Sequence, residues 1–210
     1  MLTLDKVFDA QNVLKDIITT TSLQKANRIT DNCTLYLKPE CLQKTGSFKL
    51  RGSGYKIAGL SEEEKKRGVV ACSAGNHSQG VALAATKLGI PSYICMPDGA
   101  PISKVEATKS FGAQVTLVNG VYDDAYRKAL EMRDEFGYTL VHPLTMRTSS
   151  QVRALSVLRS LPTTAISTLL SCPSAAADLS RAYPMPSSPS VPRSRSTAFR
   201  QRVRQVCSAR

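Results

Sequence analysis

One lysine of this chain stands in a sequence context that could support covalent chemistry. Lys49 follows Phe48 within residues 45–54 (TGSFKLRGSG), so an aromatic ring and flexible glycine backbone flank its amine. Desolvation and neighbouring cations lower the pKa of such an amine and make it a nucleophile. Arg51 and Lys44 are close in the sequence. Lys49 is therefore a candidate for Schiff-base chemistry, although most lysines at a helix start are solvated surface charges.

A second polar segment, residues 73–80 (SAGNHSQG), lies between an apolar run and a helical pattern. Its small residues allow close approach of a ligand to the backbone. The first N–H groups of a helix lack intrahelical partners and attract a carboxylate or phosphate. Turn geometry alone also favours Ser, Gly and Asn at such positions. The segment by itself is therefore compatible with an anion site or with an ordinary turn.

The spacing of apolar residues predicts the elements that must position these two segments. We expect helices at 4–18, 46–60, 78–88, 102–111 and 122–136, and strands at 34–37, 69–72, 92–96, 114–118 and 139–141. Strands that alternate with helices ending at glycines indicate a doubly wound α/β domain, with a parallel sheet covered on both faces. Ligands bind beyond the carboxyl ends of such strands. Residues 73–80 follow one of these ends.

The charge of the chain is unevenly distributed. Its 210 residues carry a formal net charge of +12. Residues 1–143 contain 18 basic and 15 acidic residues and all 12 glycines, whereas residues 144–210 contain ten arginines, one acid and no glycine. Nucleic-acid binding is thus a hypothesis for the tail alone, and the tail lacks the interleaved aromatic residues of a stacking platform. A non-catalytic fragment with a basic binding tail stays open as an alternative.

Other functional classes receive little support. No apolar run has the length of a membrane span and no signal-like segment opens the chain, so we expect a cytoplasmic location without membrane partners. Cys33, Cys41, Cys72 and Cys95 show no metal-ligand spacing, and we expect buried reduced thiols and no metal site.

The two segments together resemble a known family. Residues 38–52 (KPECLQKTGSFKLRG) followed by 73–80 (SAGNHSQG) are similar to the threonine/serine dehydratases among the fold-type II pyridoxal-phosphate enzymes. The resemblance covers about residues 4–143. It implies cleavage of threonine or serine to a 2-oxo acid and ammonia, pyridoxal 5'-phosphate as cofactor, and a homo-oligomeric assembly.

The resemblance also implies roles for particular residues. Lys49 would hold the cofactor as a Schiff base and remove the α-proton of the substrate, with Phe48 beside the pyridoxal ring and Asn76 at the ring hydroxyl. The loop that receives the substrate carboxylate would contain Ser73, Ala74, Gly75 and His77. For His77, a turn histidine bonded to backbone is an equally good reading.

Related enzymes of the same fold are alternatives. Serine racemases place a second serine where Ala74 stands, so Ala74 favours elimination over racemisation. The lysine motifs of cysteine synthases and of tryptophan synthase β chains differ from residues 47–52 (SFKLRG). The sequence does not separate threonine from serine as substrate, nor isoleucine biosynthesis from catabolic use.

The resemblance stops near Pro143, which divides the chain into the first part of a catalytic domain, 1–143, and a tail, 144–210. Codons for 145–160 and 172–182, shifted by one base, can encode the family's next segment and its glycine-rich phosphate loop. We therefore expect a single-base loss near Leu144 and a truncated domain with a disordered tail. Backbone N–H groups of consecutive glycines cradle a phosphate, and residues 175–178 (AAAD) cannot replace them. The 210-residue chain should therefore bind pyridoxal phosphate weakly or not at all, and it should tend to aggregate.

Overall fold

The computed structural model describes residues 4–26 and 35–142, which fall into two compact units. The larger unit contains residues 4–20 and 40–142, and the smaller one contains 21–26 and 35–39. The expectations for residues 144–210, including the AAAD segment and the disordered tail, lie outside the described residues.

A four-stranded parallel sheet forms the centre of the larger unit. Its order is β5-β4-β3-β6, from β3 (Val69–Cys72), β4 (Ser92–Pro97), β5 (Gln114–Val118) and β6 (Thr139–Leu140). Val69 is in register with both Ser92 and Thr139, and Tyr93 with Gln114. All four residues of β3 are buried, as expected for a strand covered on both faces. The predicted α/β fold with a parallel sheet is confirmed.

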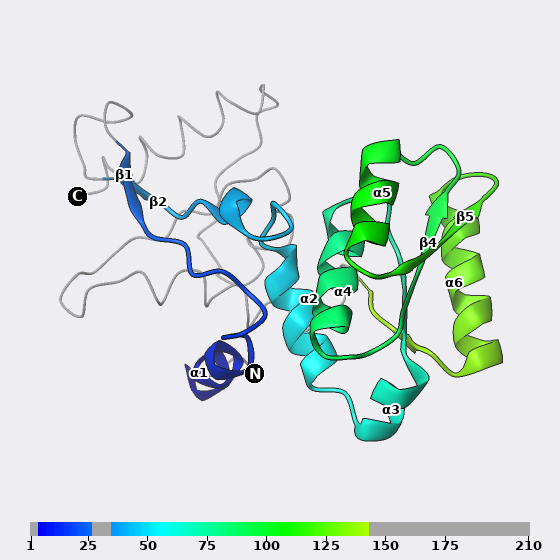
Figure 1. Cartoon of the computed structure of the whole chain (residues 1–210), viewed down its shortest axis with the longest axis horizontal. Coiled ribbons are helices and arrows are strands. Elements are labelled where there is room, and N and C mark those ends of the chain that lie inside the picture. The colour runs from blue at the N-terminus through cyan, green and yellow to red at the C-terminus, as the bar shows by residue number, and fades with distance from the viewer. Residues whose placement is uncertain (1–3, 27–34, 143–210) are drawn as a thin grey trace, which may run out of the picture. The chain divides into compact units, whose positions relative to one another are not determined.

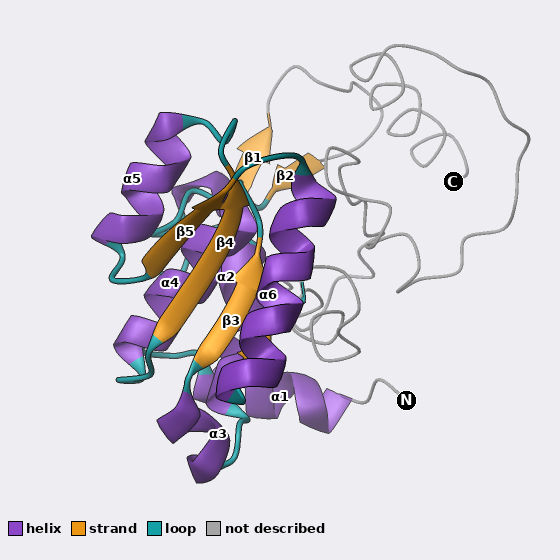
Figure 2. Cartoon of the chain, turned by 90° about the vertical axis from the view of Figure 1, so that its right-hand side faces the viewer, coloured by secondary structure: helices purple, strands orange, loops and turns teal. Residues whose placement is uncertain are grey.

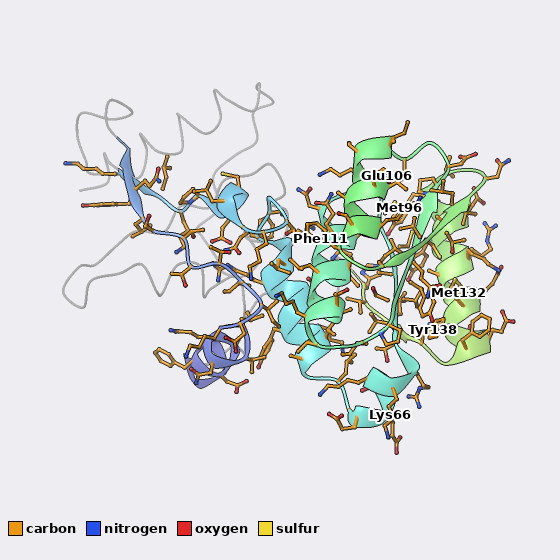
Figure 3. The ribbon with its side chains drawn as sticks, viewed as in Figure 1. Lys66, Met96, Glu106, Phe111, Met132 and Tyr138 are labelled. Carbon is orange, nitrogen blue, oxygen red and sulfur yellow. The ribbon has the colours of Figure 1, made fainter. Side chains whose placement is uncertain are left out.

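Helices cover both faces of this sheet. Figure 2 shows α6 (Tyr122–Phe136) on one face and α4 (Asn76–Lys87) with α5 (Ile102–Ser110) on the other. Ala125 and Ala129 of α6 are fully buried against the sheet, because their small side chains let the helix approach closely. Met132 is also on α6 (Figure 3). Its Sδ lies 3.6 Å from the Sγ of Cys95.

Four further helical elements belong to the described part of this unit. Helix α2 (Lys49–Ala58) packs along α4 (Figure 1), and α1 (Leu4–Val13) contacts α2. Both helices are shorter than predicted. The one predicted over 4–18 ends at Val13, and the one predicted over 46–60 begins at Lys49. Helix α3 (Glu62–Arg67) and a 3-10 turn (Glu40–Leu42) were not predicted.

Glycines follow the ends of α5 and α6, as the sequence predicts. Gly112, after α5, has a φ of 93°, and Gly137, after α6, has a φ of 71°. Because other residues rarely adopt a positive φ, these glycines allow the chain to leave each helix and turn into the next strand.

The smaller unit is an antiparallel ribbon. β1 (Gln24–Ala26) pairs with β2 (Leu35–Leu37), with Lys25 opposite Tyr36. The Lys38 ammonium donates a hydrogen bond to the Thr21 carbonyl oxygen. The strand predicted over 34–37 is present, whereas β1 was not predicted.

The cysteine expectation is only partly correct. Cys72 and Cys95 are free and buried, and burial raises the pKa of each thiol to about 11. Cys41 is exposed, because it belongs to the short 3-10 turn on the surface, so the prediction of a buried thiol is wrong there. Cys33 lies outside the described residues. Within 4–26 and 35–142, no helix could cross a bilayer and no cluster of three His, Cys, Asp or Glu side chains could hold a metal ion.

Candidate active site

Lys49 is the first residue of α2, and both of its backbone polar groups are bonded to hydroxyls. Its N–H donates to Ser47 Oγ at 3.3 Å, and Ser53 Oγ donates to its carbonyl oxygen at 3.1 Å. The half-buried side chain extends beside Phe48, with Nζ 5.9 Å from the ring centroid. The aromatic cover that the sequence suggested is therefore present.

The segment before Lys49 is anchored by a buried amide. Gln43 is 4% exposed, and its carboxamide accepts from the Thr19 N–H at 3.0 Å and donates to the Thr19 carbonyl oxygen at 2.6 Å. The Gln43 side chain thereby bonds both backbone polar groups of Thr19, as the backbone of a neighbouring strand would. It fixes residues 43–47, and thereby the start of α2, to the chain that follows α1.

The two cations near Lys49 in the sequence are bonded elsewhere. Arg51 forms a two-pronged ion pair with Glu40, at 2.7 Å from Nε and 2.8 Å from Nη2, and both side chains are largely buried. Lys44 Nζ donates to the Ile17 carbonyl oxygen at 3.2 Å. The structure therefore uses Arg51 and Lys44 to fix the backbone around Lys49.

The loop from β3 to α4 leaves open space beside its glycine. The Gly75 N–H donates to Ser73 Oγ at 3.3 Å, and Ser78 Oγ donates to the Gly75 carbonyl oxygen at 2.6 Å. A Cβ added to Gly75 would meet nothing within 4 Å. Ala74, next to it, adds only a methyl group. The N-terminus of α4 thus has room for a ligand next to its first N–H groups.

Close packing of α2 on α4 brings the lysine segment and this loop together. A Cβ on Gly80 would lie 3.2 Å from Leu50 N and 3.3 Å from Leu50 Cα. Only glycine at position 80 allows this approach between the two helices. Since Leu50 follows Lys49 directly, the contact also sets the position of Lys49 relative to the start of α4.

His77 is a buried, neutral histidine. Its ring is 6% exposed, and Nε2 lies 3.0 Å from the Val141 carbonyl oxygen. A carbonyl can only accept, so Nε2 carries the proton. Burial lowers the pKa of His77 to about 4, and the positive charge of Lys49 adds to this effect. The geometry therefore assigns the ring a backbone partner.

Asn76, the first residue of α4, has a partner that the sequence did not suggest. Its Oδ1 accepts a hydrogen bond from Lys104 Nζ at 2.7 Å, from the neighbouring helix α5. No local pattern could have predicted this contact, because the two residues are 28 positions apart. Their proximity results from the packing of α4 beside α5.

Comparison with known families identifies the class of protein. The family model described as pyridoxal-phosphate dependent enzyme matches residues 14–155. The chain belongs to this family.

Individual relatives agree with the resemblance to threonine dehydratases. The chain is 51% identical over 145 residues to the L-threonine ammonia-lyase of Thermotoga maritima, covering 68% of this chain and 36% of that protein. It is 40% identical over 142 residues to a catabolic L-threonine dehydratase of Escherichia coli K12, covering 67% of this chain and 43% of the relative. The chain thus spans less than half the length of these relatives.

A solved structure shows the same fold. The serine racemase of Dictyostelium discoideum superposes with a TM-score of 0.69 at 30% identity, covering 74% of this chain and 51% of that one.

The described residues fit part of a pyridoxal-phosphate site. Lys49 would supply the amine and Phe48 the flanking ring, since Nζ lies beside that ring, and the space beside Gly75 adjoins Asn76 in the chain. The glycine-rich phosphate loop expected from the resemblance has no counterpart after Gly137, since no glycine follows it in the sequence.

Proposed function

We propose that this chain derives from a pyridoxal-phosphate-dependent threonine/serine dehydratase, which converts threonine to 2-oxobutanoate, or serine to pyruvate, with release of ammonia. The observation that supports this most directly is the position of Lys49, which is bonded at both backbone groups and directly precedes Leu50, the residue that α4 approaches at Gly80. The relatives named as threonine ammonia-lyases add support.

We assign the residues of the site as follows. Lys49 would hold the cofactor covalently and Phe48 would pack beside the ring, while Asn76 would meet the oxygen of the ring hydroxyl. The loop that receives the substrate carboxylate would contain Ser73, Ala74, Gly75 and His77. The backbone N–H groups that open α4 suit this role, because they point out of the helix end and are not consumed by intrahelical bonds. When bound, pyridoxal phosphate supplies an electron sink for the carbanion at the substrate α-carbon.

Lys49 is also the group that moves the proton. With the cofactor bound, the Lys49 amine would remove the α-proton of the substrate, and the β-hydroxyl would take up a proton and leave as water. Water is taken up again when the product imine is hydrolysed to the 2-oxo acid and ammonia. His77 does not serve as the base, because its Nε2–H is donated to Val141 and its ring is neutral and buried.

Chemical trapping tests the lysine assignment. The chain is incubated with pyridoxal phosphate, reduced with borohydride, digested and analysed by mass spectrometry. We expect the pyridoxyl group on Lys49 in preference to Lys56, which is also half-buried on α2 and serves as the control. Lys49→Ala should abolish the modified peptide and Lys56→Ala should retain it. Equal labelling of both lysines would refute the assignment.

Serine racemase is the second candidate, supported by the structural likeness to such an enzyme. Ala74 speaks against it, because the racemases carry a serine there as the acid/base for the opposite face. With L-serine as substrate, elimination gives pyruvate and racemisation gives D-serine. Chiral chromatography and a pyruvate assay therefore separate the two proposals.

The 210-residue chain itself should have little turnover, because it lacks a glycine-rich loop for the cofactor phosphate. Restoring one base near the Leu144 codon should raise threonine dehydratase activity, measured as 2-oxobutanoate. An equally low activity in the frame-restored chain would contradict the single-base loss.

We also propose a cytoplasmic, homo-oligomeric parent protein that functions in isoleucine biosynthesis. The oligomeric state is measured by light scattering of the frame-restored chain, where a monomer would refute it. The pathway is tested by complementing a threonine-deaminase-deficient strain on medium without isoleucine, where failure to grow would favour catabolic use.

A further inference from the structure

Lys104 fixes the orientation of the Asn76 carboxamide through one hydrogen bond. The ammonium has only donors, so the carboxamide must turn its oxygen toward Lys104 to make the 2.7 Å bond. The amide NH2 is then directed to the other side of the group. Asn76 itself is exposed, so surrounding side chains do not enclose it and this bond is what selects its orientation.

The backbone that carries Lys104 is tied to the same loop. Thr108, one turn further along α5, donates to the Lys104 carbonyl oxygen at 2.8 Å and lies 3.1 Å from Ser78 Oγ. Ser78 in turn donates to the carbonyl oxygen of Gly75, which precedes Asn76. Ser78 and Thr108 are both fully buried, so this junction between α4 and α5 is shielded from water.

We propose that Lys104 is a positioning residue for the cofactor, an inference that rests on the proposed role of Asn76 as a ligand of the pyridoxal ring. Lys104 holds Asn76 with its N–H groups toward the site, so the atom that Asn76 meets must be a hydrogen-bond acceptor. The nearby positive charge further favours an anionic oxygen over a hydroxyl. Lys104 thereby selects the deprotonated ring oxygen of the cofactor.

Three variants separate this role from a general structural one. Lys104→Met keeps the apolar stem and removes the donors, and Lys104→Arg restores a donor. Lys109→Met is the matched control, since Lys109 is an exposed lysine on the same helix that pairs with Glu106. The side-chain amide resonances of Asn76 are followed by NMR in the cofactor-free chain and are assigned by their loss in Asn76→Ala. Dissociation of pyridoxal phosphate is measured by equilibrium dialysis.

We expect Lys104→Met to shift the Asn76 amide resonances and to weaken pyridoxal-phosphate binding about fivefold, equivalent to roughly 1 kcal/mol. Lys104→Arg should recover most of the affinity and Lys109→Met should change neither readout. In the Asn76→Ala background, Lys104→Met should have no further effect, because the two residues act as one unit.

Unchanged Asn76 resonances in Lys104→Met, or additive losses of affinity in the double variant, would overturn the assignment of Lys104. Equal labelling of Lys49 and Lys56 by pyridoxal phosphate would overturn the proposed function instead. The orientation of Asn76 by Lys104 would still be tested by the amide resonances.

Discussion

Replacing Gly80 by Ala tests whether the close approach of α2 to α4 sets the position of Lys49. The added Cβ would lie 2.9 Å from Ser53 Oγ, 3.2 Å from Leu50 N and 3.3 Å from Leu50 Cα. Two of these three contacts involve backbone atoms, which cannot rotate away. The helices must therefore separate by a few tenths of an ångström.

The expected magnitude is a balance of two effects. Alanine in a helix interior is favoured over glycine by about 1 kcal/mol. Overpacking a well-packed contact costs about 1–3 kcal/mol. We therefore expect Gly80→Ala to lower the free energy of unfolding by about 1 kcal/mol, measured by urea denaturation. Because Lys49 would shift with Leu50, trapping of pyridoxal phosphate on Lys49 should also decrease.

Gly54→Ala is the control for this prediction. Gly54 also lies inside a helix, but an added Cβ there meets mainly side-chain atoms, Leu14 Cδ2 at 2.9 Å and Ile17 Cγ2 at 3.3 Å. These ends can rotate, so the gain in helix propensity should offset much of the cost and labelling of Lys49 should be retained. If Gly80→Ala is as stable as Gly54→Ala and is labelled equally at Lys49, the reasoning is refuted.

Three further predictions concern buried polar groups. Glu40→Gln should lower the free energy of unfolding by about 3 kcal/mol, because it leaves the buried Arg51 guanidinium without its carboxylate; a loss below about 1 kcal/mol in urea would mean that the pair is solvated. The pKa of His77 falls from 6.5 to about 4 on folding, so its contribution to stability is complete above pH 6.5 and is lost as the pH falls toward 4. Urea titrations between pH 7 and 4.5 should show this loss in the parent and a flatter profile in His77→Gln; identical profiles would argue against a neutral buried ring. Ser92 Oγ is a buried polar atom without a partner among the described residues, so Ser92→Ala should raise the unfolding free energy by about 1 kcal/mol, and a decrease would indicate that the hydroxyl is bonded.

The helices and strands of the larger unit were mostly predictable because local patterns specify them. The apolar run at β3 and the glycine after α6 gave boundaries that agree with the structure. Helix α3 was missed although it begins with a capping box, in which Ser61 and Glu64 bond each other's backbone N–H groups. β1 was missed because a three-residue strand carries almost no periodic signal.

The candidate site was predictable in its residue types and less so in its contacts. The order of the lysine segment and the SAGNHSQG segment was sufficient to indicate the family, since both are contiguous in the sequence. The sequence could not show whether Arg51 or Lys44 points at the Lys49 amine. In the structure, Arg51 pairs with Glu40 and Lys44 bonds the Ile17 carbonyl oxygen. Such partners depend on which way each side chain leaves the backbone, which sequence proximity does not specify.

The sequence alone therefore determined the alternation of strands and helices, the family and the candidate lysine, because these follow from local periodicity and from short motifs. Only the tertiary structure decided that His77 is buried on the Val141 carbonyl oxygen, that Gly80 lets α4 reach Leu50, and that Lys104 orients Asn76. The physical reason is that burial and hydrogen bonding arise between residues that lie far apart in the chain and meet only when the helices pack on the sheet.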